Sequence, residues 1–486
     1  MQETEKIGLH STYLLFGNIL ITLLSFVITV FITIKLGPTA FGIYSFVISI
    51  FFFLSPIALF GLSSILQRNT SFYYGKKDLG AIKGYTITTS KIVLCSTSVI
   101  AVAVVLVSLL FPNFLVYTDF ILISIPFFFL TVFYTFYSSG FLTGTRKFGL
   151  AVFFDVFSKV LILLVLVVLI DMHVQGVILA NTIGVFIPLV ILIFVLLKFF
   201  SNVKTKQVHL KSYMSMSLQY FVAQTIFGIL LYLNIFVLTY FIPSFGIEEV
   251  GFYSLASNVE FYLENFLMFI GFAITPAIIQ YYGENNLQRV QKIFSLGFKY
   301  TFLLVFPVLF SLISAADVIV SDIFTKSYSG SVPILQILAF TFLATMMLRL
   351  LLPIVLAKNF VKLYLYLAIV LLTISLPLTF FLTSEFSSIG AAVSRVVPIV
   401  LGTFIFVSVV TKKAKLPLPL KFLMLEFLSA SIFLLLFIAP RNIFFIAVSF
   451  LGLLAVYLGI LFVVGVIDKS DINRVISFLN SLRNSL

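Results

Sequence analysis

The sequence has few charged residues, and this scarcity excludes a water-soluble fold. Only 10% of the 486 residues are Asp, Glu, Lys or Arg, whereas soluble domains carry about 25%. The hydrophobic share is 61% and the mean hydropathy is +1.22, which together indicate an integral membrane protein. Such a composition leaves room for about 14 or 15 spanning helices of about 20 residues each.

Cysteine, histidine and enzymatic motifs are scarce or absent. Cys95 is the single cysteine, so no internal disulfide can form, and three scattered histidines are too few for a metal cluster. The sequence contains no GxxxxGK[ST] phosphate loop, no HExxH and no GxSxG. Its hydrophilic segments are too short for a nucleotide-binding or catalytic domain. We therefore expect neither an enzyme nor an ATP-driven pump, and no metal or organic cofactor.

Fourteen apolar segments follow one another along the chain, each long enough to cross a bilayer as a helix. Their predicted bounds are 12–34, 41–66, 84–111, 115–140, 148–170, 174–200, 213–241, 250–280, 293–315, 333–357, 361–382, 389–410, 422–439 and 443–467. Runs of this length without polar alternation do not suit barrel strands, and a helix satisfies its own backbone in lipid. The sequence predicts an all-α polytopic membrane protein. The charged start MQETEK is not that of a signal peptide, so we expect the first segment to be retained.

The positions of Lys and Arg predict the orientation in the membrane. With the N-terminus inside, 22 of the 30 basic residues fall on the cytoplasmic side and only Lys35, Lys326 and Arg441 in outer loops. The net charge of +13 therefore reflects topology and contact with membrane lipids, and we expect no nucleic-acid partner. The sequence predicts a bacterial cytoplasmic membrane protein with both termini in the cytoplasm.

Two halves of the sequence resemble each other. Residues 36–45, LGPTAFGIYS, align with residues 245–254, FGIEEVGFYS, at an offset of 209, and YYGKKD at 73–78 aligns with YYGENN at 281–286 at an offset of 208. A weaker match aligns Gly176 with Gly390 at an offset of 214. Because this offset equals six spans, spans 1–6 and 7–12 are predicted to be parallel repeats, a transporter architecture with a central cleft and alternating access. The predicted domains are residues 1–212, residues 213–415, and a two-helix extension at 416–486.

Several motifs give the sequence a family resemblance. IKLGPTAFGIYSFV around the first turn, EEVGFYSLASNVE, the YYG turn and GFLTGTRKF resemble the polysaccharide transport (O-antigen flippase) branch of the multidrug/oligosaccharidyl-lipid/polysaccharide superfamily. The resemblance covers spans 1–12, and the added helix pair also occurs in that branch. Members commonly carry Arg where this chain has Lys35, which keeps the charge but loses bidentate phosphate binding.

The resemblance implies a V-shaped transporter and a function. It implies flipping of polyprenyl-diphosphate-linked oligosaccharide, the repeat unit of O-antigen, capsule or exopolysaccharide, to the outer leaflet. A polysaccharide polymerase and a chain-length regulator are the candidate protein partners. A cation-coupled exporter of drugs or metabolites from the same superfamily is the alternative. An integral-membrane polymerase is a third possibility, but the outer loops are too short for its catalytic domain.

Charged side chains inside the predicted spans mark candidate functional sites, because each costs roughly 2.5–3.5 kcal/mol on insertion scales. Glu260 and Glu264 share one face of span 8 and are candidates for binding a coupling H+ or Na+. The alternative is that they pair with Lys91, Arg349 or Arg395.

Basic and amide side chains are the candidates for holding the diphosphate and the glycan. Arg349 lies where an incoming diphosphate would meet a guanidinium, Arg395 lies in span 12, and each has an anchoring role as its alternative. Asp155 is a candidate cavity acid, but Asp155 and Lys159 are one turn apart and can neutralise each other. The predicted substrate-cavity residues are Arg349, Lys91, Lys159, Arg395, Lys35, Asn18 and Asn234. For the amides Asn18 and Asn234, holding helices together is the alternative to binding sugar hydroxyls.

Overall fold

The computed structural model describes residues 2–110, 117–208, 214–267, 278, 281–284, 286–358 and 360–468, and their regular secondary structure is helical throughout. The main helices are α1 (Gln2–Leu59), α2 (Leu62–Gly75), α3 (Leu79–Leu110), α4 (Thr118–Ile123), α5 (Ile125–Thr135), α6 (Phe148–Leu169), α7 (His173–Phe199), α8 (Met214–Tyr240), α9 (Ile242–Phe245), α10 (Glu248–Leu267), α12 (Leu287–Val318), α13 (Ser331–Leu338), α14 (Thr341–Ala357), α15 (Val361–Ala414), α16 (Leu420–Ala430) and α17 (Ile443–Val463). Short helices of other types are the π-helices η1 (Phe136–Leu142) and η4 (Ile319–Phe324) and the 3₁₀ helices η2 (Ile170–Met172), η5 (Lys326–Tyr328) and η6 (Ser431–Ile438).

A helix occupies each of the fourteen predicted spans, although the described residues include only nine separate stretches that are long and apolar enough to cross a membrane. Three of those stretches, Gly17–Leu59, Phe148–Phe199 and Val361–Ala414, are each long enough for two crossings. Two further predicted spans correspond to α8 and α10. The last part of the predicted span 250–280 lies outside the described residues. The predicted all-α polytopic fold is confirmed.

The doubled helices turn at single residues. In α1 the break is at Gly37, whose φ of 72° is a conformation that favours glycine, and Pro38 then begins the second segment with its fixed φ. In α15 the break is at Ser387, with φ 50° and ψ −133°. Both breaks lie between two predicted spans, so they are the turns that the sequence predicts.

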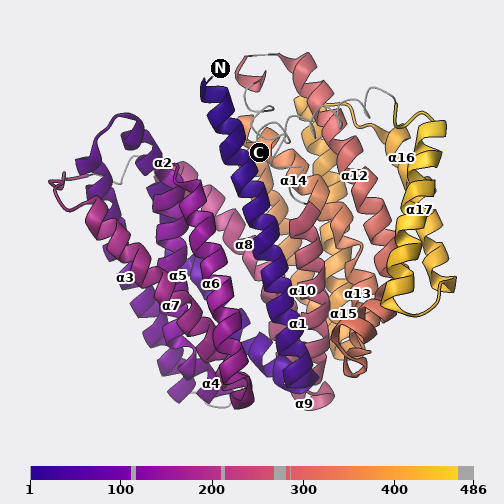
Figure 1. The fold of residues 1–486 in the computed structure, drawn as a ribbon, viewed down its shortest axis with the longest axis horizontal. Helices are drawn as coiled ribbons and strands as arrows, with labels where there is room; N and C mark the ends of the chain where they lie inside the picture. Colours follow the sequence, from indigo (N-terminus) through magenta and orange to yellow (C-terminus); the bar gives the residue numbers. More distant parts are fainter. Residues whose placement is uncertain are drawn as a thin grey trace. The chain divides into compact units, whose positions relative to one another are not determined.

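The helices form two compact units. The first contains residues 1–266 and 360–398, and the second contains residues 267–359 and 399–486. Figure 1 shows the helices within each unit running side by side. These units are defined by packing, and the division at residues 212 and 415 that follows from the repeat stays a prediction.

Within the first unit, the two aligned segments exchange equivalent contacts. A Cβ atom added to Gly42 would overlap the carbonyl oxygen of Ile247, and one added to Gly251 would overlap the carbonyl oxygen of Pro38. Ile247 is 209 residues after Pro38, and Gly251 is 209 residues after Gly42. A two-fold relation between equivalent segments produces this exchange, so the packing agrees with a parallel repeat at an offset of 209.

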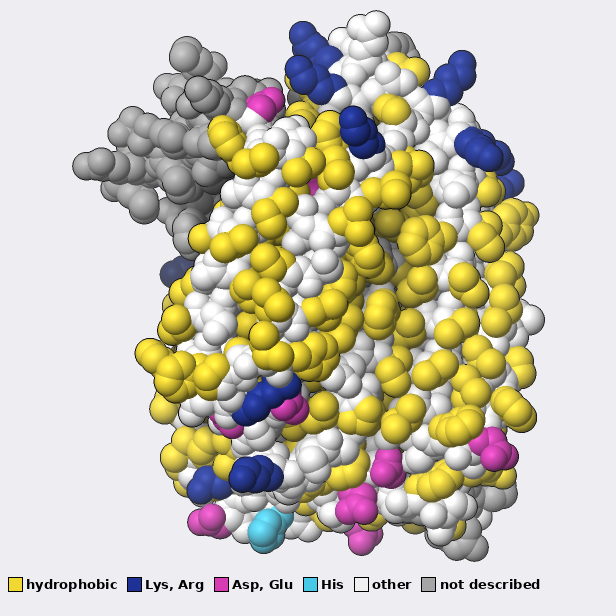
Figure 2. Space-filling view, turned by 90° about the vertical axis from the view of Figure 1, so that its right-hand side faces the viewer, with side chains coloured by type: hydrophobic (Ala, Val, Ile, Leu, Met, Phe, Trp, Pro, Cys, Tyr) yellow, Lys and Arg dark blue, Asp and Glu magenta, His cyan; other side chains and the backbone are white. Residues whose placement is uncertain are grey.

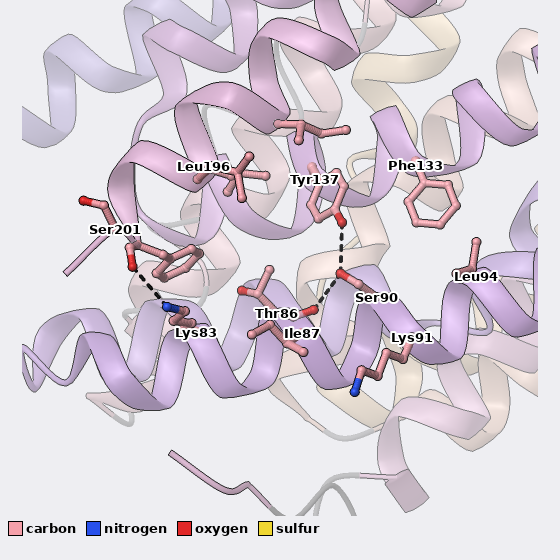
Figure 3. A pocket seen from close by; sticks show the side chains of 13 residues that line it. Lys83, Thr86, Ile87, Ser90, Lys91, Leu94, Phe133, Tyr137, Leu196 and Ser201 are labelled. Atoms are coloured by element: carbon pink, nitrogen blue, oxygen red, sulfur yellow. Dashed lines mark hydrogen bonds between the residues drawn. The ribbon is translucent and has the colours of Figure 1, made fainter. Parts of the chain in front are cut away.

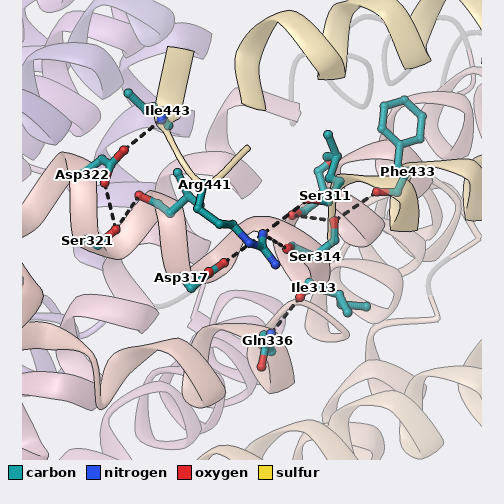
Figure 4. A network of polar contacts seen from close by, with 12 residues as sticks. Ser311, Ile313, Ser314, Asp317, Ser321, Asp322, Gln336, Phe433, Arg441 and Ile443 are labelled. Carbon is teal, nitrogen blue, oxygen red and sulfur yellow. Dashed lines mark hydrogen bonds and ion pairs between the residues drawn. The ribbon is translucent and has the colours of Figure 1, made fainter. Parts of the chain in front are cut away.

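In the second unit, an ion pair and hydrogen bonds connect the C-terminal helix pair to the C-terminal end of α12 and the residues after it. Arg441, in the turn before α17, pairs with Asp317 at 3.4 Å and donates a 3.1 Å hydrogen bond to the carbonyl oxygen of Ser314 (Figure 4). The backbone N–H of Ile443 donates to Asp322 at 2.8 Å. These contacts hold α16 and α17 against α12.

One face of the molecule has the character of a lipid-covered surface. Figure 2 shows mostly hydrophobic side chains across its middle, with Lys and Arg gathered at one end and acidic side chains, beside a few basic ones, near the other. Charges confined to the two ends of an apolar band are typical of a protein that spans a bilayer.

Candidate functional site

A buried ion pair lies in the first unit between α10 and α15. Arg395 Nη2 is 2.7 Å from Glu260 Oε2, and the two side chains are only 8% and 1% exposed. Arg395 Nη1 also donates to the hydroxyl of Ser257 at 3.4 Å. Glu264 is one turn further along α10, is buried, and interacts electrostatically with Arg395. The two acids predicted to share a face therefore meet one arginine.

Asn234 of α8 joins this pair to a neutral hydrogen-bond network. Its amide nitrogen donates to the Tyr253 hydroxyl at 2.9 Å, and its amide oxygen accepts from Thr379 at 3.3 Å and from Ser394 at 3.2 Å. Because the Tyr253 side chain also hydrogen-bonds Arg395, the network and the ion pair are continuous. We call this set the polar cluster; it consists of Asn234, Tyr253, Ser257, Glu260, Glu264, Thr379, Ser394 and Arg395.

The backbone break in α15 is also tied to α10. The hydroxyl of Ser388, directly after the Ser387 break, donates a short hydrogen bond to Glu249 in the first turn of α10. The same two helices therefore meet at this contact and at the Arg395–Glu260 pair. Together these contacts fix the register of α15 against α10.

The first half contains a neutral counterpart of the polar cluster. The Asn181 amide donates to the Tyr44 hydroxyl at 3.3 Å. Tyr44 aligns with Tyr253 at the offset of 209, and Asn181 aligns with Arg395 at the offset of 214. At the offset of 209, Glu260 and Glu264 align with Phe51 and Ser55, so the acids and the arginine occur in the second half alone.

Apart from Asp155 and Lys159, which are neighbours on α6, the remaining predicted residues of the first unit are not brought together. Lys35 is exposed two residues before the Gly37 break, and Asn18 is exposed on α1. Asp155 accepts a 2.6 Å hydrogen bond from the Tyr134 hydroxyl, and within the described part of the chain its contact with Lys159 is electrostatic and not a direct ion pair.

Lys91 lines a cavity of about 560 Å³ among α3, η1 and α7 (Figure 3). The Lys91 ammonium is exposed, whereas Lys83 at one end of the cavity donates to the carbonyl oxygens of Phe200 and Val203 at 3.1 and 2.8 Å. The Ser90 and Tyr137 hydroxyls are 3.1 Å apart, and the other lining side chains are mainly apolar. Such a cavity can take an apolar chain with an anionic group near Lys91.

Arg349 belongs to the second unit, where it is half-buried on α14. The structure therefore brings together four of the predicted residues, Asn234, Glu260, Glu264 and Arg395. Arg349, Lys91, Lys35, Asn18, Asp155 and Lys159 are not members of the polar cluster.

The sequence analysis missed Tyr253, Ser257, Thr379 and Ser394, which have no charge to distinguish them from ordinary polar residues of a span. It also missed Glu426 of α16, a fully buried acid in the second unit. The signal for Glu426 was available, since it is an acidic residue inside the apolar segment 422–439.

The polar cluster can bind a cation and can respond to its binding. A carboxylate inside a membrane protein can be neutralised by a proton or a monovalent cation. Binding at Glu264 would change the charge beside Arg395 and hence the strength of the α10–α15 contact. Glu260 and Glu264 therefore stay the candidates for the ion site that the sequence predicts.

Two family models match the sequence. The model described as polysaccharide biosynthesis protein matches residues 9–270, which is more than half of the chain, and the MatE model matches residues 225–381. The MatE match includes Asn234, Glu260 and Glu264. No curated protein matches the chain significantly by sequence.

Solved transporter structures share the fold. The lipid II flippase MurJ, in an inward closed conformation, is 16% identical with a TM-score of 0.65, and the match covers 93% of this chain and 97% of MurJ. A transporter of the MOP superfamily from Pyrococcus furiosus is 11% identical with a TM-score of 0.62, covering 84% of this chain and 95% of that one. The Vibrio cholerae MATE transporter VcmN, as a point mutant, is 16% identical with a TM-score of 0.60, covering 84% and 96%.

These matches agree with the resemblance carried by the glycine and tyrosine motifs. The family model includes the LGPTAFGIYS segment and its counterpart FGIEEVGFYS, and the structural matches extend over most of the chain. The chain therefore belongs to the polysaccharide biosynthesis protein family, and it shares the fold of solved MOP superfamily transporters.

Proposed function

We propose that the protein flips polyprenyl-diphosphate-linked oligosaccharide repeat units, destined for O-antigen, capsule or exopolysaccharide, from the cytoplasmic to the outer leaflet of a bacterial cytoplasmic membrane. Both termini lie in the cytoplasm in this proposal, as the Lys and Arg distribution predicts. A polysaccharide polymerase and a chain-length regulator are the proposed protein partners downstream of it.

The observation that carries the proposal is the extent of the structural matches. The flippase match covers 93% of the chain, whereas the matches to the Pyrococcus transporter and to VcmN each cover 84%. The difference in how much of this chain is covered is about the size of the C-terminal helix pair α16–α17. This pair lies outside the six-plus-six repeat. The polysaccharide biosynthesis family match supports the same class of substrate.

Exposed cations are the proposed contacts for the substrate diphosphate. Lys35 and Lys91 are exposed in the first unit, which supports them as contacts for an anion. Arg349 of the second unit is a separate candidate, because a guanidinium suits a diphosphate. Arg395 is engaged with Glu260, so we assign it to the ion site. In this proposal the polyprenyl tail stays in lipid and H+ or Na+ at Glu260 and Glu264 biases the inward and outward states.

Deleting the gene in its native host tests the proposed substrate. We expect polyprenyl-diphosphate-linked oligosaccharide to accumulate in the cytoplasmic leaflet and surface polysaccharide to be lost, measured by mass spectrometry and leaflet-specific labelling. Complementation with the intact gene should restore both. Normal lipid-linked glycan and normal surface polysaccharide in the deletion strain would contradict the proposal.

A cation-coupled exporter of drugs or metabolites is the second candidate, and the MatE match, which includes Glu260 and Glu264 but ends before Arg395, favours it. The same deletion strain distinguishes the two functions. Raised sensitivity to cationic compounds, together with an unchanged glycan, would assign the protein to the exporter class.

Glu264→Gln tests ion coupling separately from the substrate. The amide keeps the shape of the side chain but cannot lose a proton, so transport should fall while expression stays intact. Glu385→Gln makes the same change at an exposed position of α15 and should leave transport unaffected. Transport by the Glu264→Gln protein that equals wild type across a range of pH would refute the coupling.

A further inference from the structure

Glu426 is a buried acid with unsatisfied oxygens in the C-terminal helix pair. Its side chain is 0% exposed, and neither carboxyl oxygen has a hydrogen-bond partner among the residues that the structure describes. It lies six residues after the start of α16, which is about 9 Å along the helix. An ionised carboxyl without a partner is unstable in such surroundings, so this group needs a proton or a cation.

Three helices enclose Glu426. In Figure 1 α16 and α17 lie side by side with α12 at one edge of the second unit. Phe427, the next residue, packs against Phe306 and Phe310 of α12, with ring centroids 5.4 and 5.2 Å apart. Tyr457 of α17 is fully buried and donates its hydroxyl to the carbonyl oxygen of Leu303 at 3.2 Å. The carboxyl is therefore surrounded by side chains from all three helices.

Lys299 is the charged group that faces Glu426 from α12. It is buried, its ammonium lies 5.6 and 5.7 Å from the ring centroids of Tyr300 and Phe422, and it interacts with Glu426 electrostatically without a hydrogen bond. From α17 the titratable neighbour is Tyr457. On α16 itself Lys421 is exposed, as is Lys292 on α12.

We propose that Glu426 is a proton-binding site between α12, α16 and α17, with Lys299 as its alternative partner. In the first of the two proposed states the carboxyl holds the proton and needs no counter-ion. When the proton leaves to water, the carboxylate becomes the counter-ion of Lys299, and the ion pair changes how α16 packs on α12. A hard metal cation fits this place poorly, since it takes several oxygen ligands and the neighbours are an ammonium, an engaged hydroxyl and phenyl rings.

The site is independent of the proposed substrate and of the polar cluster. Glu426 and Lys299 lie in the second unit, whereas Glu260, Glu264 and Arg395 lie in the first. α16 and α17 also lie outside the predicted repeat. The proton would therefore act on the attachment of the C-terminal helix pair, whatever molecule the transporter carries.

Infrared difference spectroscopy of the purified full-length protein in nanodiscs tests the proposal. As the pH is raised, the carbonyl stretch of a protonated carboxyl should disappear in the wild type. This band should be missing in Glu426→Gln and unchanged in Glu385→Gln, which alters an exposed glutamate of α15. The spectra need no substrate and no transport assay.

A lysine variant provides a second measurement that keeps Glu426 in place. Lys299→Met removes the counter-ion of the deprotonated state, so the band should persist to a more alkaline pH than in the wild type. The matched variant Lys421→Met, at an exposed lysine of α16, should titrate like the wild type. No Glu426-dependent band at any pH, or a band unaffected by pH and by Lys299→Met, would overturn the proposal.

Discussion

Arg395 and Glu260 neutralise each other inside the first unit, so each depends on the other. Removing one partner of a buried pair leaves an uncompensated charge, which costs about 3–5 kcal/mol. We expect Arg395→Met to lower the free energy of unfolding by about this amount, measured by thermal or denaturant unfolding of the purified protein. Lys326→Met, at an exposed lysine, should have no measurable effect.

The double variant Arg395→Met/Glu260→Gln separates the pair from the individual side chains. The double variant removes both charges of the direct pair, and only the interaction of Glu264 with Arg395 stays lost, so a large part of the lost stability should return. A double variant as unstable as Arg395→Met alone would contradict a stabilising charge pair.

Asp78 gives a pH dependence outside the membrane spans. Lys206 donates a 2.6 Å hydrogen bond to it and the Ala81 N–H donates another, and both hold the pKa of this carboxyl below its ordinary value of 3.8. A lowered pKa in the folded state gives stability that is present above the ordinary pKa and lost as the pH falls through the lowered value. Residues 204–206 should therefore stay attached to the start of α3 from neutral pH to about pH 4.

Hydrogen exchange of residues 200–208 measures this attachment. Protection in the wild type should fall as the pH drops below about 4, after correction for intrinsic exchange. Asp78→Asn, which cannot ionise, should show weaker protection that no longer depends on pH. Equal, pH-independent protection in both proteins would contradict the role of the pair.

Sequence analysis identified the charged residues of the site but not their partners. Glu260, Glu264 and Arg395 are conspicuous because charges are rare in apolar segments. The pairing of Glu260 with Arg395 could not be chosen over Lys91 or Arg349, because it joins residues 135 positions apart. Burial and hydrogen bonding depend on helix packing, which periodicity within one helix does not specify.

At the scale of helices, the glycines between α1 and α10 set how closely these elements approach. Gly42→Ala and Gly251→Ala each place a Cβ atom into a backbone carbonyl group, which cannot rotate away as a side chain can. Each substitution should lower the melting temperature of the purified protein, with a destabilisation of roughly 1–3 kcal/mol typical of overpacking.

Two other glycines are matched controls for this prediction. A Cβ atom on Gly149 or Gly228 meets no atom within 4 Å, and both residues lie in helices. Gly149→Ala and Gly228→Ala should therefore be neutral or stabilising by up to about 1 kcal/mol, because alanine favours the helix. Similar losses at all four positions would show that the close approach is not the cause.

The helices themselves were largely predictable from the sequence. The length of an apolar segment identifies a membrane-spanning helix without knowledge of how that helix packs. Every predicted span accordingly contains a helix. The breaks were only partly predictable: Gly37 precedes a proline, whereas Ser387 lies in a stretch without a glycine or proline signal next to it. His173, 214 residues earlier, has nearly the same backbone angles, φ 53° and ψ −131°, so this break recurs at equivalent positions of the two halves.

At the scale of the whole molecule, the two halves have kept a common geometry and acquired different chemistry. The contact between Tyr44 and Asn181 in the first half corresponds to the contact between Tyr253 and Arg395 in the second half. Only the contact in the second half includes a charged residue. Charged side chains can therefore replace neutral ones at these aligned positions while the helix arrangement stays the same. In the proposed function, ion binding would therefore act on the second half alone.

The reciprocal contact of Gly42 and Gly251 also bears on the history of the chain. Two identical protomers related by a dyad would meet in this way, so the contact has the geometry of a homodimer interface within one polypeptide. After a gene duplicates and fuses, its copies drift apart, as Phe51 and Glu260 have done. At the dyad neither copy can drift alone, because a side chain on either glycine strikes the backbone of the other copy. In a duplicated and fused chain, the contact between these two glycines is therefore the place where the likeness of the two copies is best preserved.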